Sequence, residues 1–243
     1  MKIKWLDKKN LHSAAMLDML PASVLLDIGC GIVPQEYVST HVQICCEPYS
    51  EYVERLQKIV SEKHGRNYLV LNMGWGDVIN YFPENSVDTV ILVDVIEHLD
   101  KDEGMRLLEL TSKLARKQVI IFTPYGFMPQ HHHDGKDAWG LGGGSWQEHK
   151  SGWLPEDFKG EGWSFYVSKE FHDVDSLGQR TEEVYGAFWA IQTKEGGMAG
   201  SNYDQELDFQ KMTANLKRRE SEINGYFLVR LENKIRRILS GKR

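Results

Sequence analysis

The stretch from Val24 to Gly31 constrains the fold more than any other. Three apolar residues, an acid and an isoleucine lead into two glycines that flank Cys30. This is the pattern of a buried parallel strand that ends in a tight turn. Gly29 and Gly31 lack a Cβ, so the turn can adopt positive φ and let a ligand approach its N–H groups. Asp27, at the carboxyl end of the strand, is placed to accept hydrogen bonds across the crevice.

A nicotinamide dinucleotide site is one interpretation of such a turn. That fingerprint has a third glycine where the following helix begins. Ile32, Val33 and Pro34 stand there instead, so a pyrophosphate cradle at a helix N-terminus is poorly supported. A ligand without phosphate groups fits the sequence better.

The glycine stretch resembles motif I of the class I S-adenosylmethionine-dependent methyltransferases, whose acid-x-Gly-x-Gly turn wraps the methionine part of the cofactor. Val33 departs from the glycine usual at its position. With the four features below, the resemblance covers roughly residues 20 to 125 and implies S-adenosylmethionine as cofactor, with S-adenosylhomocysteine as product. The positions that it assigns to cofactor binding are Asp27, Gly29, Cys30, Gly31, Glu47, Pro48, Gly76, Asp77, Val93 and Asp94.

The second feature is Glu47, which lies twenty residues after Asp27 and closes the apolar run Val42 to Cys46. An acid at that distance, at the end of the second strand, is placed to bind a pair of ribose hydroxyls. The third is a strand from Asn67 to Leu71, followed by Asp77. In the family, an acid near this place often hydrogen-bonds the adenine amino group.

The fourth feature, Ser86 to Leu99, predicts a buried strand with a polar exit. It closely resembles the fourth-strand region of many small-molecule and lipid methyltransferases. Gln118 to Thr123 predicts a fifth strand where the family has one.

Strands that alternate with helices predict an α/β fold. Helices are expected at 50–63 and 100–117, and a leading helix over the sheet at 1–21. Residues 163–168 and 184–193 are predicted as the last two strands, an antiparallel hairpin at the edge. The expected fold is a Rossmann-like, doubly wound, seven-stranded and mostly parallel sheet with an antiparallel last strand.

The 243 residues fit one large domain with a modest extension. We expect a methyltransferase domain at 1–195, in which the loop 125–160 lies on the substrate side. Residues 196–243 are expected to form a linker and a basic amphipathic C-terminal helix. Such a helix is suited to a homodimer contact or to a peripheral contact with an anionic membrane.

Composition narrows the class of partner. A net charge of −6 argues mildly against a dedicated nucleic-acid binder. Three cysteines, two of them adjacent, imply no disulfide framework, so a cytoplasmic location is expected. No signal-peptide core and no stretch long enough to span a membrane stand out.

Two histidines are candidates for a catalytic base. His98 leaves the fourth strand where the transferred methyl group should lie, and its neighbour Glu97 is placed to orient it. His149, in a His-x-Ser-x-Trp run, is the rival base or substrate anchor, and a structural role for either remains open. We expect no metal site, because the adjacent histidines of residues 131–133 point in divergent directions; a site that combines them with Asp137 or His149 is the alternative.

The sequence therefore predicts a methyltransferase (EC 2.1.1.-) that acts on a small molecule or on a glycan or lipid precursor. O-methylation is slightly favoured over N-methylation, because no Asn-Pro-Pro-aromatic motif follows the fourth strand. The alternatives are a non-catalytic scaffold that retains the fold and binds the cofactor, and a nucleic-acid methyltransferase.

Overall fold

The computed structural model describes residues 2–131, 135–174 and 180–194. Contacts divide the chain into two units, Met1–Ser201 and Asn202–Arg243. The predicted linker and basic helix at 196–243 lie outside the described residues, as do His132 and His133 of the histidine run.

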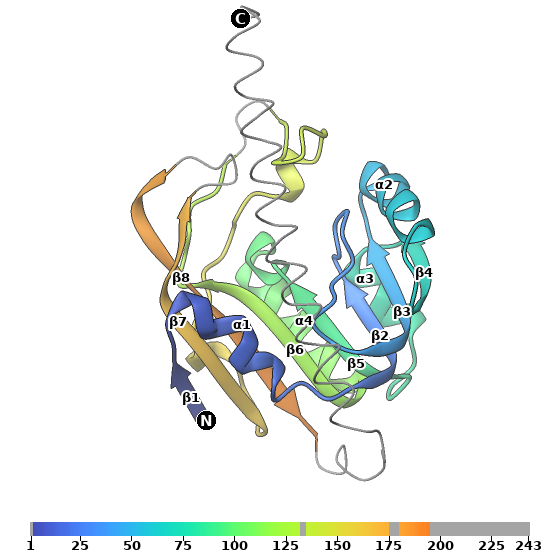
Figure 1. Cartoon of the computed structure of the whole chain (residues 1–243), viewed down its shortest axis with the longest axis horizontal. Helices are drawn as coiled ribbons and strands as arrows, with labels where there is room; N and C mark the ends of the chain where they lie inside the picture. Colours follow the sequence, from blue (N-terminus) through green and yellow to red (C-terminus); the bar gives the residue numbers. More distant parts are fainter. Residues whose placement is uncertain (1, 132–134, 175–179, 195–243) are drawn as a thin grey trace, which may run out of the picture. The chain divides into compact units, whose positions relative to one another are not determined.

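An eight-stranded sheet has the spatial order β1-β7-β8-β6-β5-β2-β3-β4 (Figure 1). β8 runs antiparallel to β6 and β7, and the other neighbouring strands are parallel. The strands are β1 (Lys2–Trp5), β2 (Ala22–Ile28), β3 (Thr40–Glu47), β4 (Asn67–Asn72), β5 (Val87–Val93), β6 (Ala115–Tyr125), β7 (Trp163–Val174) and β8 (Arg180–Thr193). Among the described residues, the α-helices are α1 (Lys8–Met16), α2 (Ser50–Ser61), α3 (Trp75–Tyr81) and α4 (Lys101–Leu114), and the 3-10 helices are η1 (Ile96–His98), η2 (Gly144–Trp146) and η3 (Pro155–Asp157).

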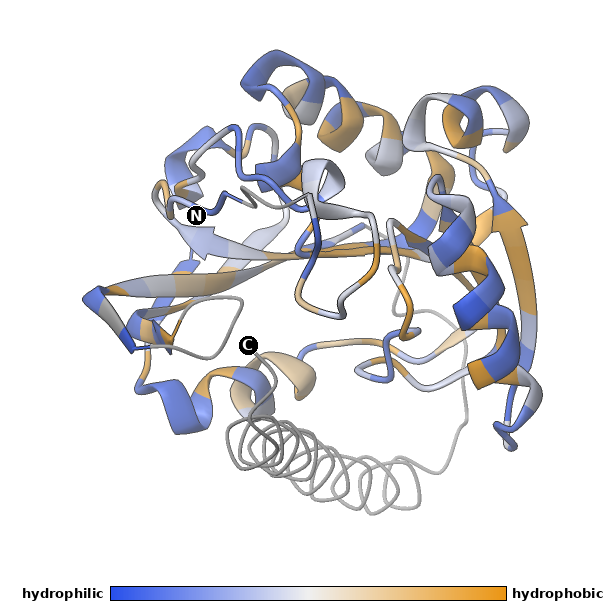
Figure 2. Cartoon of the chain, turned by 90° about the horizontal axis from the view of Figure 1, so that it is seen from above, coloured by the Kyte–Doolittle hydropathy of each residue, from blue (hydrophilic) through white to orange (hydrophobic). Residues whose placement is uncertain are grey.

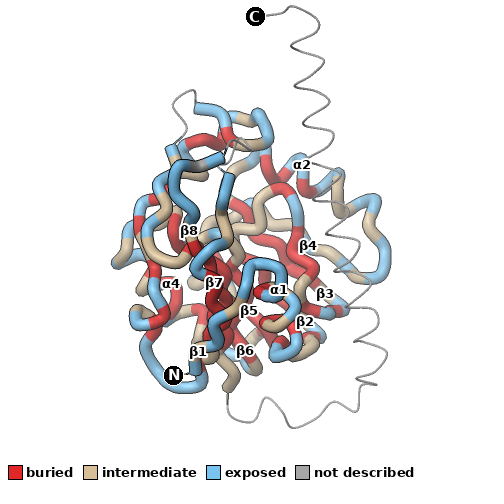
Figure 3. The backbone as a smooth tube through the Cα atoms, turned by 60° about the vertical axis from the view of Figure 1, so that its left-hand side comes forward, coloured by how far each residue is buried: buried red, intermediate tan, exposed pale blue. Residues whose placement is uncertain are grey.

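The sheet is packed on both faces. In Figure 1, α1 lies in front of β6 to β8, and α3 and α4 lie behind the sheet. Along β6, Val119 and Ile121 join the apolar cluster that contains Leu107 and Leu114 of α4. The buried segments of Figure 3 follow the central strands, and the helices alternate hydrophilic and hydrophobic residues (Figure 2), as helices with one buried face do. Within the described residues, no helix combines the length and the apolar character needed to cross a membrane.

The doubly wound fold expected from the sequence is confirmed. The strands predicted between residues 42 and 123 coincide with β3 to β6. The two predicted last strands are β7 and β8, which pair antiparallel. The helices expected at 50–63 and 100–117 are α2 and α4, each of them shorter at its C-terminal end.

The prediction for the N-terminus was partly wrong. A helix was expected over 1–21, but Lys2–Trp5 form β1 and α1 ends at Met16. β1 pairs in parallel with β7, so the sheet has one strand more than expected and the β7–β8 hairpin is not its edge. Partners remote in sequence decide such a short edge strand, because local propensity is weak there. Leu17, which follows α1, is 62% exposed.

The connection from β2 to β3 contains no helix. Residues 29–39 cross the sheet as turns and irregular backbone. The Asp27 carboxylate accepts the Gln35 N–H at 3.1 Å, and the Arg66 guanidinium donates to the backbone oxygens of Gln35 and Val38. Side chains from β2 and from the turn before β4 therefore satisfy backbone groups that a helix would satisfy internally.

Asp88 joins three strands at their amino ends. The residue is buried, and its Oδ2 accepts the Ser23 N–H at 2.7 Å. Its Oδ1 accepts Nη2 of Arg116 at 3.0 Å. Burial alone would raise the pKa of this carboxyl, but the hydrogen bonds from Ser23 and Arg116 outweigh it and lower the pKa.

We expect Asp88→Asn to lower the free energy of unfolding at pH 7 by about 1–3 kcal/mol, because the buried donors lose a charged acceptor. The pKa of Asp88 is lower in the folded chain than in the unfolded chain. The ionised carboxylate therefore stabilises the fold fully above the unfolded pKa of about 4, and this stabilisation is lost as the pH falls through the folded pKa. Urea unfolding from pH 7 to pH 3 measures this. The exposed Asp7→Asn is the control, and a difference from wild type that does not shrink in acid would contradict the assignment.

Candidate active site

The glycine turn after β2 has the backbone that the sequence predicts. Gly29 has φ +70° and Gly31 has φ +61°. A Cβ on Gly29 would lie 2.9 Å from Cγ2 of Val95, and one on Gly31 would lie 3.4 Å from the Trp139 ring. The turn therefore needs glycine at residue 29 for two reasons, its left-handed conformation and its close approach to the exit of β5.

Glu47 lies at the carboxyl end of β3, beside this turn. Its Oε2 accepts the Gly31 N–H at 2.9 Å, and its Oε1 accepts the Tyr49 N–H at 3.0 Å. Burial raises the pKa of Glu47, although the bonds from Tyr49 and Gly31 act in the opposite direction. The carboxylate thus links the ends of β2 and β3 where the sequence predicts a ribose site.

The Asp27 carboxylate accepts hydrogen bonds from other residues of the protein. Its Oδ2 accepts Nε2 of Gln43 at 2.7 Å as well as the Gln35 N–H, and the residue is buried. Direct contact between Asp27 and a ligand stays a prediction. Its carboxylate and the thiols of Cys30 and Cys45 lie within 4.8 Å of one another, and a hydrogen bond with Cys45 and burial raise the pKa of Cys30.

The other predicted cofactor positions lie at the ends of neighbouring strands. The Pro48 carbonyl, after β3, accepts the Asn72 side chain at 2.9 Å. Gly76 and Asp77 are exposed in the first turn of α3. Val93 ends β5, and Asp94 follows it with φ +52°. All belong to the carboxyl edge of β5, β2, β3 and β4, which are adjacent in the sheet, so the predicted positions share one edge.

The two candidate bases meet at the same edge of the sheet. His98 ends η1, directly after β5, and His149 belongs to the loop between β6 and β7. Their ring centroids are 5.0 Å apart. One ligand atom from each ring and a carboxylate oxygen of Glu97 lie within 4.8 Å of one another. Sequence reasoning singled out each histidine but did not predict that they would be neighbours.

Each imidazole is oriented by a backbone carbonyl. Nδ1 of His98 lies 3.1 Å from the Glu148 oxygen, and Nδ1 of His149 lies 2.6 Å from the Met128 oxygen. A carbonyl oxygen only accepts hydrogen bonds, so Nδ1 carries the proton in both rings and Nε2 is the basic nitrogen.

The loop that carries His149 is fastened to η1. The Glu97 carbonyl accepts the N–H groups of Lys150 and Ser151 at 2.7 and 3.1 Å. The Ser151 hydroxyl donates to the Ile96 oxygen at 3.2 Å. These bonds fix the approach of His149 to Glu97.

Two carboxyl groups are crowded here. Glu97 is 2% exposed, and its Oε2 accepts the Thr123 hydroxyl at 2.9 Å. Burial raises the pKa of Glu97, and the charge of the neighbouring Asp94, which is itself exposed, raises it further.

Three tryptophans of the loop occupy different places. Trp153 is fully buried, and the Lys101 ammonium lies 3.7 Å from the centroid of its ring. It closes the loop onto the core. Trp139 and Trp146 are exposed, and Trp139 packs edge-on against Tyr52 beside the glycine turn.

His172 is a further candidate site residue. Sequence reasoning missed it because the predicted strand ended at residue 168, whereas β7 extends to Val174. Its Nε2 is buried without a hydrogen-bond partner among the described residues. Burial, with the nearby charge of His149, lowers its pKa to about 4. The imidazole is therefore neutral at physiological pH.

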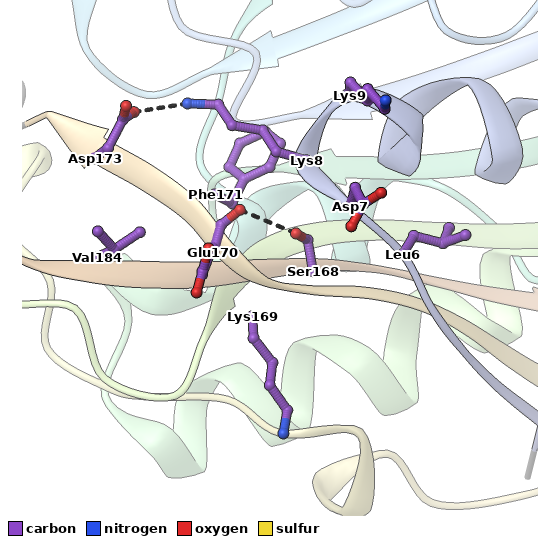
Figure 4. A pocket seen from close by; sticks show the side chains of 10 residues that line it. All are labelled: Leu6, Asp7, Lys8, Lys9, Ser168, Lys169, Glu170, Phe171, Asp173 and Val184. Carbon is purple, nitrogen blue, oxygen red and sulfur yellow. Dashed lines mark hydrogen bonds and ion pairs between the residues drawn. The ribbon is translucent and has the colours of Figure 1, made fainter.

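A surface pocket of about 840 Å³ lies where the start of α1 meets β7 (Figure 4). Lys8 and Asp173 form an ion pair at 2.6 Å across it. Phe171 also lines the pocket and packs against His12 and Phe122. None of the lining residues is among the predicted site residues.

Comparison with known proteins shows which solved structures have a similar fold. No protein-family model and no curated protein sequence matches this chain. Among solved structures, TehB from Haemophilus influenzae is 14% identical with a TM-score of 0.51, over 75% of this chain and 61% of that chain. The small RNA methyltransferase HEN1 is 17% identical with a TM-score of 0.50, over 77% of this chain and 25% of that chain.

This chain has the class I methyltransferase fold. The cyclopropane synthase MmaA2 from Mycobacterium tuberculosis is also similar, at 21% identity and a TM-score of 0.39 over 48% of this chain. The match spans only 42% of MmaA2. In the methyltransferase fold of this chain, β1 lies outside β7 at the end of the sheet.

Gly29→Ala tests the turn. We expect a loss of about 1–2 kcal/mol of stability for the left-handed backbone and a further ~1–3 kcal/mol for the contact with Val95. Gly135→Ala is the matched control, because Gly135 also has φ +70° but an added Cβ there would meet nothing within 4 Å. Thermal unfolding compares the two variants, and equal losses would show that Val95 imposes no constraint.

Proposed function

We propose that this chain is an S-adenosylmethionine-dependent methyltransferase. The observation that carries the proposal is the grouping of the positive-φ glycines 29 and 31 with the Glu47 carboxylate at the carboxyl edge of a class I methyltransferase sheet. Ligands of open α/β sheets bind outside this edge. HEN1, which has a similar fold, is by name a small RNA methyltransferase.

The residues at this edge fit the cofactor. The glycine turn has no side chains at residues 29 and 31, so the methionine part can approach its backbone closely, while the N–H groups of these two glycines bond the Cys46 carbonyl and the Glu47 carboxylate. Glu47 is placed to bind ribose hydroxyls, and the exposed Asp77 to bind the adenine amino group. When bound, S-adenosylmethionine supplies a methyl group on a sulfonium, and the carbon–sulfur bond breaks with its electron pair going to sulfur.

The acceptor side of the proposed site is formed by Glu97, His98 and His149. An acceptor hydroxyl gives its proton to Nε2 of one of the two imidazoles, and its oxygen forms the new bond to carbon. The loop fastened to η1 holds these groups at fixed positions and limits the access of water. The two basic nitrogens favour oxygen acceptors over amines, since a neutral amine needs only alignment.

We propose a small-molecule, glycan or lipid-precursor acceptor, in keeping with the net charge of −6. An RNA acceptor is the alternative, and it predicts strongly salt-dependent RNA binding. The second alternative, a non-catalytic scaffold protein, would bind the cofactor but transfer no methyl group.

Calorimetric titration with S-adenosylmethionine and S-adenosylhomocysteine tests the cofactor. We expect both to bind wild type, and Glu47→Ala to weaken binding by about 1.5–3 kcal/mol, the increment of a hydrogen bond to a charged group. Glu54→Gln, an exposed acid of α2, is the control. Unchanged affinity in Glu47→Ala would contradict the ribose assignment, and no binding by wild type would contradict the proposed function.

Transfer of a labelled methyl group to a panel of hydroxyl and amine acceptors tests the chemistry. We expect His98→Ala or His149→Ala to lose about 10²–10⁴-fold in kcat if its imidazole is the base, with cofactor affinity retained. Normal turnover by both variants would exclude both as bases.

A further inference from the structure

Glu97, His98 and His149 together have the chemistry of a metal site. A carboxylate oxygen and one nitrogen from each imidazole lie within 4.8 Å of one another. Bonds of about 2.0–2.2 Å to one ion place its ligand atoms up to about 4.4 Å apart, so small side-chain rotations would bring all three into contact with the same ion.

The Glu97 carboxylate points to an ion independently. It is 2% exposed, and its Oε1 has no hydrogen-bond partner among the described residues. A buried carboxylate oxygen without a partner is costly. Among the described residues, no lysine or arginine forms an ion pair with Glu97 or with the neighbouring Asp94. The hydrogen bond between the side chains of Glu97 and Asp94 joins two acids, so a cation would supply the positive charge that this pair lacks.

The imidazoles are arranged as metal ligands are. Each Nδ1 bonds a backbone carbonyl, at Glu148 for His98 and at Met128 for His149. This second contact fixes the tautomer and presents Nε2 as the ligand atom, the usual arrangement around metal-bound histidine. The bonds from the Glu97 carbonyl to Lys150 and Ser151 hold the two halves of the site together.

We propose that Glu97, His98 and His149 bind one divalent transition-metal ion, such as Mn²⁺ or Zn²⁺. Mixed nitrogen and oxygen donors suit such ions better than Mg²⁺ or Ca²⁺, which prefer oxygen alone. Three protein ligands leave positions on the ion for water or for an acceptor oxygen.

The use of the ion rests on the proposed function. A hydroxyl oxygen bound to the ion loses its proton to water more readily, and the site lies at the sheet edge proposed to bind the methyl donor. His98 and His149 are then ligands instead of bases. The acceptor would be a molecule that offers an oxygen to the ion.

Metal titration of the full chain, stripped with EDTA, tests the proposal. We expect wild type to bind one Mn²⁺ or Zn²⁺ in calorimetry. Glu97→Gln and His149→Ala should weaken that binding by on the order of 100-fold or more, since even groups that only orient a ligand contribute 10–100-fold. His64→Ala, an exposed histidine, is the matched control and should bind as wild type does.

Two further measurements keep the test decisive. A variant with alanine at residues 131–133 should still bind the ion. If this variant lost metal binding while Glu97→Gln kept it, the proposal would be overturned. If a site variant does not fold by circular dichroism, pulsed EPR of Mn²⁺-loaded wild type decides, because imidazole ligands give nitrogen couplings and their absence would overturn it.

Cofactor titration of the metal-free chain separates this inference from the proposed function. Binding of S-adenosylhomocysteine without any binding of Mn²⁺ or Zn²⁺ would overturn the metal site alone. Metal binding at Glu97 and His149 without cofactor binding would support the site and contradict the proposed function.

Discussion

The parallel pairing of β2 with both β3 and β5 is the constraint on which the rest of the structure depends. Parallel strands end at the same edge of a sheet, so the segments that leave them are neighbours however far apart they lie in sequence. Gly29, Glu47 and Asp94 are brought together in this way. The parallel pairing of β5 with β6 in the same way places the loop of His149, which follows β6, beside the exit of β5, where the Glu97 carbonyl accepts two N–H groups of the loop.

Residues whose patterns are local could be predicted from the sequence. The apolar runs of β2, β3, β5 and β6 are buried strands in a parallel sheet, whereas β4, at the edge of the sheet, is only partly covered. The positive φ of Gly29 and Gly31 follows from the same logic, because a strand that ends in two glycines turns sharply. This much of the fold and of the cofactor edge needs no knowledge of contacts.

What could not be predicted depends on partners remote in sequence. β1 is a strand because β7 offers it an edge, and nothing in Lys2–Trp5 alone decides this. Trp153 is buried because Gly104 leaves space for its ring, whereas Trp139 and Trp146, in the same loop, are exposed. The meeting of His98 with His149 requires the path of a long loop, which no periodicity specifies.

The helix-free connection between β2 and β3 has a consequence for how this protein can vary. A helix satisfies its own backbone, so its sequence can drift while its shape persists. Residues 29–39 instead take their donors and acceptors from Asp27 and Arg66. Gln35, within the loop, accepts the N–H groups of Tyr37 and Val38, so the shape of the loop is encoded only in part outside it, by Asp27 and by Arg66 in the turn before β4.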